Sequence, residues 1–236
     1  MENRIREILE FKYHFTQDNG QTKEFTIRLH PRTLELIHEP YAKLPTWTNL
    51  EFGKCPNCTL SKEKHKSCPN AANLVSITEF FQKSSSFEDV EVRLETYERI
   101  YNKKTSLQQG VSSLLGIIMV TAGCPILSKL RPMVRFHLPF ATTEETIYRA
   151  ISMYLVKQYF RKKKGLEPDW ELKGLLNTYK EIHILNQAFY ERLSFLKGKD
   201  ANVNALIILD NFANYINFTL DRDKLSKIEW MFKDPD

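Results

Sequence analysis

Four cysteines are the residues of this chain with the clearest capacity for chemistry. Cys55 and Cys58 form a C-x2-C pair, Cys68 follows ten residues later, and Cys124 lies much farther along the chain. A C-x2-C turn directs two sulfurs to one side, so that both can bind one metal ion. We therefore predict a metal site with four thiolate ligands, which joins two distant parts of the fold.

The segment between Cys55 and Cys68 favours a metal. It is rich in lysine and poor in residues that can form a core, so a metal ion is a natural source of its order. Zinc is the first expectation, with His65 as an alternative ligand. An iron–sulfur cluster is the other expectation, because three of the four cysteines precede proline and the residues after Cys68 and Cys124 are largely apolar. Apolar surroundings protect a cluster from water.

The cysteine pattern is open to three other interpretations. Structural disulfides belong mainly to exported proteins, and nothing in the sequence indicates export. Buried, chemically inert thiols are common in protein cores. A redox-active C-x-x-C pair normally lies between a strand and a helix, and that setting is missing here.

A second group with possible chemistry is Arg131, Arg135 and His137, in a proline-bounded segment directly after the fourth cysteine. If this segment is extended, the three side chains point to the same side. Two guanidinium groups and an imidazole beside a metal then form a pocket for an anion or a phosphate. In the alternative interpretation, the arginines pair with Glu144, Glu145 or other carboxylates and fix the loop.

Two weaker signals lie farther along the chain. His183 and Asn186 fall on the apolar stripe of an expected helix, where they line a pocket or form a satisfied polar pair in the core. The basic run from Arg161 to Lys164 is typical of a solvated helix end. Binding of nucleic acid or acidic lipid by this run is less favoured, because no aromatic-rich motif accompanies it.

Composition limits the class of protein. The chain has 236 residues, of which 42% are hydrophobic, and a formal net charge of +5. It can therefore form a sizeable core, and its mild basicity alone does not imply nucleic acid. The N-terminal residues lack the apolar core of a signal peptide, and the most apolar run, 111–122, is too short to span a bilayer. We expect a cytoplasmic protein with no membrane partner.

Hydrophobic periodicity predicts an α+β fold, with a small antiparallel sheet in the N-terminal half and a mainly helical C-terminal half. Residues 4–30 are expected to form a hairpin with an Asn19–Gly20 turn, and a strand region near 90–94 continues through Tyr97 to Tyr101. Region 1–104 is β-rich and contains the cysteine segment 55–68, region 105–236 is helical, and the two pack as one domain. The expected helices cover residues 70–82, 106–122 with Gly123 as its cap, 142–165 with Thr142 or Thr143 as its N-cap, 169–196, 202–216 and 222–232.

Four segments of the chain are similar to a family of bacterial proteins of unknown function. They are residues 55–58 (CPNC), 68–74 (CPNAANL), 113–125 (SLLGIIMVTAGCP) and 130–140 (LRPMVRFHLPF). The resemblance covers nearly the whole chain and implies a bacterial, cytosolic, single-polypeptide protein. It implies no activity, substrate or site residue.

Three functions follow from these signals. The first is a metal-containing sensor or adaptor that recognises an anionic ligand or a protein partner. The second is a zinc- or cluster-dependent enzyme that uses Arg131, Arg135 and His137 as substrate clamps and acid–base group. The third is a nucleic-acid-binding protein with a structural zinc. Common nucleotide-binding, hydrolase and zinc-protease motifs are absent from the sequence, which weakens the enzyme classes that use them.

Overall fold

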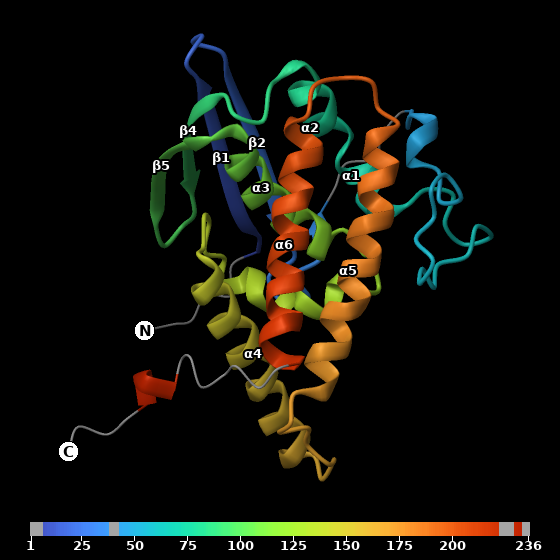
Figure 1. Ribbon diagram of the computed structural model, residues 1–236, viewed down its shortest axis with the longest axis vertical. Coiled ribbons are helices and arrows are strands. Elements are labelled where there is room, and N and C mark those ends of the chain that lie inside the picture. Colours follow the sequence, from blue (N-terminus) through green and yellow to red (C-terminus); the bar gives the residue numbers. More distant parts are fainter. Residues whose placement is uncertain (1–6, 38–42, 222–228, 233–236) are drawn as a thin grey trace.

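Five antiparallel strands form one sheet in the N-terminal half of the protein. The computed structural model describes residues 7–37, 43–221 and 229–232 (Figure 1). The strand order in the sheet is β3-β2-β1-β4-β5, and each neighbouring pair is antiparallel. The predicted α+β class is therefore confirmed. The strands are β1 (Leu9–Gln17), β2 (Thr22–Leu29), β3 (Leu36–Ile37), β4 (Asp89–Glu95) and β5 (Ile100–Ser106).

The hairpin of β1 and β2 has the predicted turn. Its pairing begins with Leu9 opposite Leu29. Gly20 has a φ of +82°, and its amide donates to the Gln17 carbonyl at 2.9 Å. Glycine adopts this left-handed conformation without the steric penalty of a side chain, which explains its place in the turn.

Alternation along β1 separates an inner face of the sheet from an outer face. Phe11, Tyr13 and Phe15 are buried, whereas Lys12 and His14 between them are only partly buried. The inner side chains pack in the core and the outer ones reach water, as expected for a sheet that is covered on one side. The sheet therefore presents its inner face to the helices.

The second strand region differs from the prediction. Its continuation through Tyr97 to Tyr101 is interrupted by a turn, in which the Thr96 amide donates to the Arg99 carbonyl at 2.9 Å. The chain reverses there, and β5 returns along β4. The sequence pattern missed this turn because it contains neither glycine nor proline.

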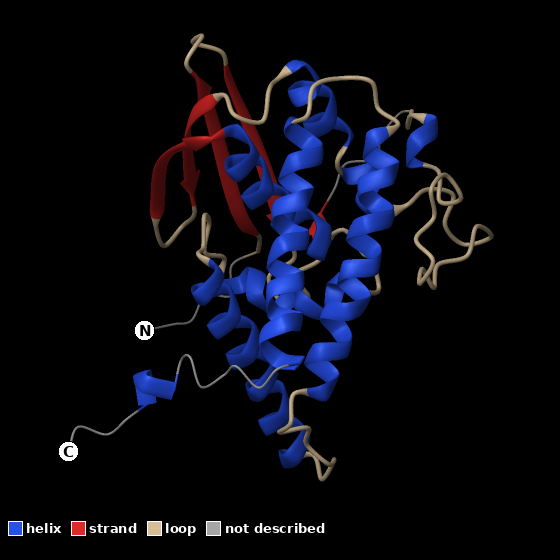
Figure 2. Ribbon diagram, in the orientation of Figure 1, coloured by secondary structure: helices blue, strands red, loops and turns tan. Residues whose placement is uncertain are grey.

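Helix α3 lies between the sheet and a layer formed by α5 and α6 (Figures 1 and 2). Residues of both halves of the chain belong to one cluster of buried side chains. Among the described residues, no helix combines the length and the apolar composition that a membrane span requires. The helices are α1 (Pro69–Asn73), α2 (Val75–Phe80), α3 (Leu107–Thr121), α4 (Thr143–Lys163), α5 (Lys173–Ser194) and α6 (Ala201–Asp221), and the 3-10 helices are η1 (Thr46–Thr48), η2 (Phe81–Lys83), η3 (Leu127–Phe136) and η4 (Trp230–Phe232).

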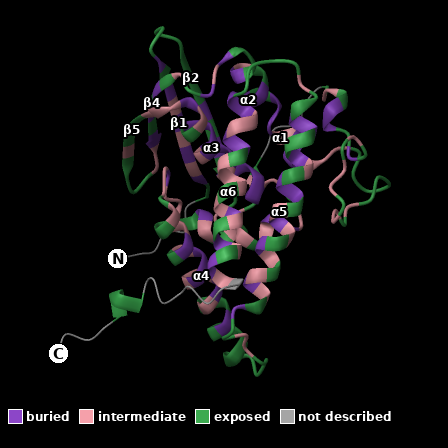
Figure 3. Cartoon of the chain, in the orientation of Figure 1, coloured by how far each residue is buried: buried purple, intermediate pink, exposed green. Residues whose placement is uncertain are grey.

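The ends of α3 and α4 follow the predicted signals. Gly123 lies just after α3 with a φ of +101°. Thr142 caps α4: its hydroxyl accepts from the Glu145 amide at 3.2 Å, and the Glu145 carboxylate accepts from the Thr142 amide at 2.7 Å. This reciprocal pair satisfies two amides that the first turn leaves free. Gly165, with a φ of +71°, follows the basic end of α4, which is exposed (Figure 3).

The last helices have different limits from those predicted. Helix α5 begins at Lys173 instead of Asp169, because Leu172 is left-handed with a φ of +58° and the Asp169 carboxylate accepts from the Lys173 and Gly174 amides at 3.2 and 2.7 Å. Helix α6 extends to Asp221, five residues beyond the expected end at 216. Of the expected helix 222–232, residues 222–228 lie outside the described ranges, and η4 occupies its end.

Candidate functional site

The C-x2-C pair closes a turn that is attached to α5. The Cys58 amide donates to the Cys55 carbonyl at 3.0 Å. The Cys55 thiol lies 3.9 Å from the Leu185 carbonyl, and the Asn57 side-chain amide donates to the Glu181 carbonyl at 2.9 Å. The cysteine turn is therefore held against the helical layer by side-chain contacts on both sides of Pro56.

Cys68 and Cys124 are connected by the packing of the residues next to them in the sequence. Cys68 immediately precedes α1, with Pro69 as the first helical residue. A Cβ atom added to Gly123 would lie 3.9 Å from the Pro69 Cβ, so the end of α3 passes close to the start of α1. Cys124, the next residue after Gly123, is 9% exposed. The long sequence separation between Cys68 and Cys124 is thus bridged by direct packing.

Electrostatics indicates that the four thiols share one neighbourhood. Burial and, to a smaller extent, the neighbouring thiols of Cys68, Cys124 and Cys58 together raise the pKa of the Cys55 thiol to about 12. Burial also raises the pKa of Cys124, although two backbone amides that follow it donate to its sulfur and oppose that shift. Cys55 is therefore a protonated, weakly nucleophilic thiol at neutral pH.

The predicted metal ligands are near each other without forming a coordination group. All four cysteines are free thiols, and His65 is exposed. Within the described ranges, no three or more His, Cys, Asp or Glu side chains are arranged to hold a metal ion. The metal-binding role of the four cysteines stays a prediction.

A buried arginine that the sequence analysis missed supports the segment leading to the cysteine turn. Arg192 is 1% exposed. It donates to the carbonyls of Trp47 and Asn49 at 2.8 and 2.9 Å, and to those of Leu50 and Gly53 at 3.3 and 3.2 Å. Four backbone acceptors thus stabilise one buried charge, and no sequence motif marks this arrangement.

The segment with Arg131, Arg135 and His137 is helical, and the expected extended conformation is wrong. Residues 127–136 form η3, so the two arginines do not point to one side with the histidine. Arg131 lies 3.1 Å from a Glu35 oxygen, and Arg135 lies 3.9 Å from a Glu98 oxygen. Their partners are therefore carboxylates of the sheet region. Of the three predicted anion-binding residues, His137 lines the cavity described next, while the two arginines lie outside its lining.

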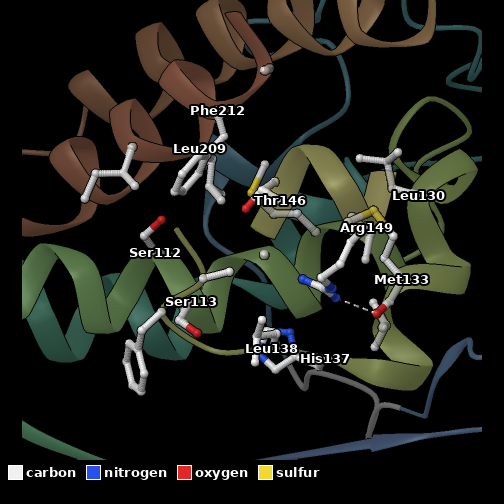
Figure 4. A pocket seen from close by; sticks show the side chains of 18 of the residues that line it. Ser112, Ser113, Leu130, Met133, His137, Leu138, Thr146, Arg149, Leu209 and Phe212 are labelled. Carbon is white, nitrogen blue, oxygen red and sulfur yellow. Dashed lines mark hydrogen bonds between the residues drawn. The ribbon is translucent and has the colours of Figure 1, made fainter. Parts of the chain in front are cut away.

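A cavity of about 430 Å³ lies where η3 faces α3, α5 and α6 (Figure 4). This volume falls in the range of about 300–1,000 Å³ typical of small-molecule sites. Lys103, Gln109 and Thr142 are exposed and mark its mouth. The apolar part of the lining includes Met119, Val120, Leu127, Leu130, Met133, Val134, Leu138, Ile182, Leu209 and Phe212.

A chain of hydrogen bonds connects the cavity wall to the sheet. The buried Tyr13 hydroxyl lies 2.8 Å from the Ser113 hydroxyl and 2.7 Å from His137 Nε2. Burial, together with the charge of Arg149, lowers the pKa of His137 to about 3, and burial raises the pKa of Tyr13 well above its usual range. Both groups are therefore neutral near pH 7, and they fix the position of η3 against β1 and α3.

Arg149 reaches the cavity from the first half of α4 (Figure 4). Its Nη2 atom donates to the carbonyls of Met133 and Phe136, both at 3.0 Å. Burial lowers the pKa of Arg149, and the charge of Glu145 partly opposes that shift, although no carboxylate of a described residue forms an ion pair with Arg149. The cavity wall therefore contains a partly buried cation that is held by backbone dipoles.

Three buried polar side chains also line the cavity without a hydrogen-bond partner in the protein. Ser112 is 4% exposed, Tyr179 is 4% exposed and Asn186 is 3% exposed. None of these side chains forms a hydrogen bond with any residue in the part of the chain that the structure describes. The polar atoms of these three side chains keep some accessible surface at the cavity, so they can form hydrogen bonds with a bound molecule or with water.

A family described as a domain of unknown function (DUF6901) matches residues 10–233. The chain belongs to this family. No curated protein and no solved structure matches the chain.

Within this DUF6901 domain, the sequence pattern indicated only part of the cavity. Asn186 was expected to line a pocket or form a polar pair together with His183, but His183 contacts Asp210 at 2.9 Å and lies outside the cavity lining. Tyr179 was expected only as a member of an apolar stripe. Arg149 carried no signal, since its place in the cavity depends on η3 folding back over the start of α4.

Proposed function

We propose that this protein binds a small ligand with an apolar body in the cavity between η3, α3, α5 and α6. The supporting observation is a cavity of suitable size whose mainly apolar wall contains polar groups that have no hydrogen-bond partner among the described residues. A ligand can form hydrogen bonds with these polar groups, and each such bond contributes about 0.5–1.5 kcal/mol. The protein then acts as a sensor or adaptor that responds to its ligand.

Binding is better supported than catalysis, which is the alternative. His137 is neutral, and its Nε2 is already engaged by Tyr13. An acid–base catalyst near pH 7 needs a pKa closer to the working pH. The buried thiol of Cys55 is also a poor nucleophile, because its pKa is raised.

The third function, nucleic-acid binding, has less support. The basic end of α4 and the lysine-rich segment 54–66 lie at separate places on the molecule (Figure 1). Lys54 also pairs with Glu51 at 2.9 Å. A continuous basic groove would be expected for a nucleic-acid partner.

We place the protein in the bacterial cytosol on the sequence arguments alone, and free thiols suit that reducing compartment.

Fluorescence titration with 1-aminoanthracene, a small neutral fluorophore, tests the binding function. We expect saturable binding by the wild type. The variant Gly116→Leu should bind roughly tenfold more weakly, because Gly116 lines the cavity and a larger side chain fills it. Circular dichroism would establish that the variant remains folded.

Glu191→Leu is the control, since Glu191 is exposed on α5 and lies outside the cavity lining. It should bind the fluorophore as the wild type does. Binding that is absent from the wild type, or that is equal in the wild type and Gly116→Leu, would contradict the proposal.

The second candidate function is metal binding by Cys55, Cys58, Cys68 and Cys124. It is favoured by the mutual electrostatic effect of the four thiols and by the backbone amides that donate to the Cys124 sulfur. Such amides also stabilise a thiolate that binds a metal. Zinc is the first choice and an iron–sulfur cluster the alternative. Binding requires the thiols to lose their protons and draw together, since the described side chains form no coordination group.

Metal analysis with a visible absorption spectrum, on protein purified without air, tests this second candidate. One zinc per chain without colour supports a structural zinc site, and iron with sulfide supports a cluster. Cys124→Ser should lower the metal content and the melting temperature. Protein without metal, or a variant with unchanged metal content, would contradict four-cysteine binding.

A further inference from the structure

The lining of the cavity has one sign of charge. Arg149 lies in its wall and Lys103 at its mouth, and no aspartate or glutamate is among the described residues that line it. Lys103 lies over the Phe140 ring, with its Nζ atom 5.6 Å from the ring centre. A cavity with cations and no carboxylate attracts anions and disfavours cationic ligands.

Arg149 is suited to bind an anion instead of serving only as a structural cation. Its two hydrogen bonds to the backbone of η3 both use Nη2. No hydrogen bond from Nε or Nη1 to a described residue is present, so these donors remain for a ligand. A partly buried cation without an ion pair is stabilised by a bound anion, because the low dielectric strengthens the attraction between opposite charges.

Tyr179 provides a second donor near the same charge. Burial raises the pKa of Tyr179 well above its usual range, while the Arg149 charge opposes this shift, which indicates that the two groups interact. The hydroxyl therefore keeps its proton near pH 7 and can donate it to an anion. Asn186 also lies on α5, seven residues beyond Tyr179, and its unpartnered amide can hold a second polar group.

The apolar wall determines the rest of the ligand. Leu209 and Phe212 of α6 face Leu130 and Met133 of η3 across the cavity (Figure 4). These side chains provide hydrophobic contact along the cavity and no further charge. A small inorganic anion would leave this apolar surface in contact with water, so it is disfavoured.

We infer that the ligand is a small organic anion: a carboxylate on an apolar body, with the carboxylate bound by Arg149 and Tyr179. This inference rests on the proposed binding function and names its ligand class. His137 lies in the same wall as a neutral group and does not add to the positive charge.

Displacement of 1-aminoanthracene by three eight-carbon probes tests the inference. Octanoate, 1-octanol and octylamine share one chain and differ in the charge of the head group. We expect octanoate to compete at a concentration roughly tenfold lower than 1-octanol, with octylamine weakest. Equal competition by octanoate and 1-octanol, or stronger competition by octylamine, would overturn the anion assignment while the binding function stands. Absence of fluorophore binding would overturn the binding function itself.

Two variants locate the effect in the cavity. Arg149→Met should abolish the preference for octanoate over 1-octanol, and Tyr179→Phe should reduce it roughly threefold to fivefold. The matched controls are Arg135→Met, outside the cavity lining, and Tyr190→Phe, on the exposed side of α5. If Arg149→Met does not fold, Tyr179→Phe still decides, since it removes a single hydroxyl. An unchanged preference in Tyr179→Phe would exclude that hydroxyl as a carboxylate donor.

Discussion

Helix α3 packs differently on its two sides. On the side of the sheet, a Cβ atom added to Gly110 would lie 2.8 Å from Val92 Cγ2 and 3.0 Å from Phe15 Cε1. On the side of α6, a Cβ atom added to Gly116 would meet Leu209 at 3.7 Å, an ordinary contact, beside the cavity of about 430 Å³. One helix thus has a fully packed side that specifies the fold and an incompletely packed side with room for a ligand.

We expect the two sides of α3 to differ most in the stability that is lost when an aromatic ring is removed. Phe15→Ala should lower the free energy of unfolding by about 3–5 kcal/mol, because Phe15 is 1% exposed and its ring packs against Phe25 and Phe81. Phe212→Ala should lower it by about 1–2 kcal/mol, since this ring already borders an empty volume. Urea unfolding of both variants measures the two values. Equal losses would show that the cavity side is packed as tightly as the sheet side.

We expect the free energy of unfolding to depend on pH because of His137, which lies between the sheet and the cavity. The pKa of His137 is lowered to about 3 in the folded protein, whereas the unfolded value is near the ordinary 6.5. Between these pH values the unfolded chain binds a proton that the folded protein does not, so stability falls as pH decreases below about 6.5. The slope is at most ~1.4 kcal/mol per pH unit.

Urea unfolding from pH 7 to pH 4.5 measures this slope. His137→Gln should reduce it, because the variant lacks the titrating group. The variant retains all the other histidines. An unchanged slope in the variant would therefore assign the pH dependence to groups other than His137.

The two glycines of α3 should respond with opposite signs to the same substitution. Gly116→Ala should stabilise the protein by up to about 1 kcal/mol, since alanine favours a helix and the added methyl group has room. Gly110→Ala gains the same helix preference but forces Val92 or Phe15 to move, and overpacking costs about 1–3 kcal/mol. We expect a net loss of about 1–2 kcal/mol in thermal and urea unfolding. A gain in both variants would contradict the tight contact with the sheet.

The smallest expected effect concerns the hydrogen bonds that connect the two sides. Tyr13→Phe removes the hydroxyl that lies between Ser113 and His137 and should lower stability by about 1 kcal/mol. Tyr190→Phe, at an exposed position, should have almost no effect. If the two variants are equally stable, the buried hydrogen bonds make no net contribution.

Local patterns in the sequence predicted most of the elements. The alternating residues and the Asn19–Gly20 turn predicted the first hairpin, and Thr142 with Glu145 marked the start of α4. These signals depend on neighbours within a few residues, so the chain specifies them before any tertiary contact forms. The turn between β4 and β5 and the start of α5 were missed, because their turns involve Thr96 and Leu172, which lack the usual turn residues.

Local patterns in the sequence are enough to predict the α+β class, most of the helices and strands, and a cysteine spacing that favours a metal. Only the packed fold shows that η3 is helical, that Arg149 reaches the cavity, and that Tyr179 and Asn186 lack partners there. A helix or strand depends on local periodicity and capping, whereas a cavity depends on how several elements pack together. No residue of the chain signals an empty volume, because that volume exists only between α3, η3 and α6 once they have packed.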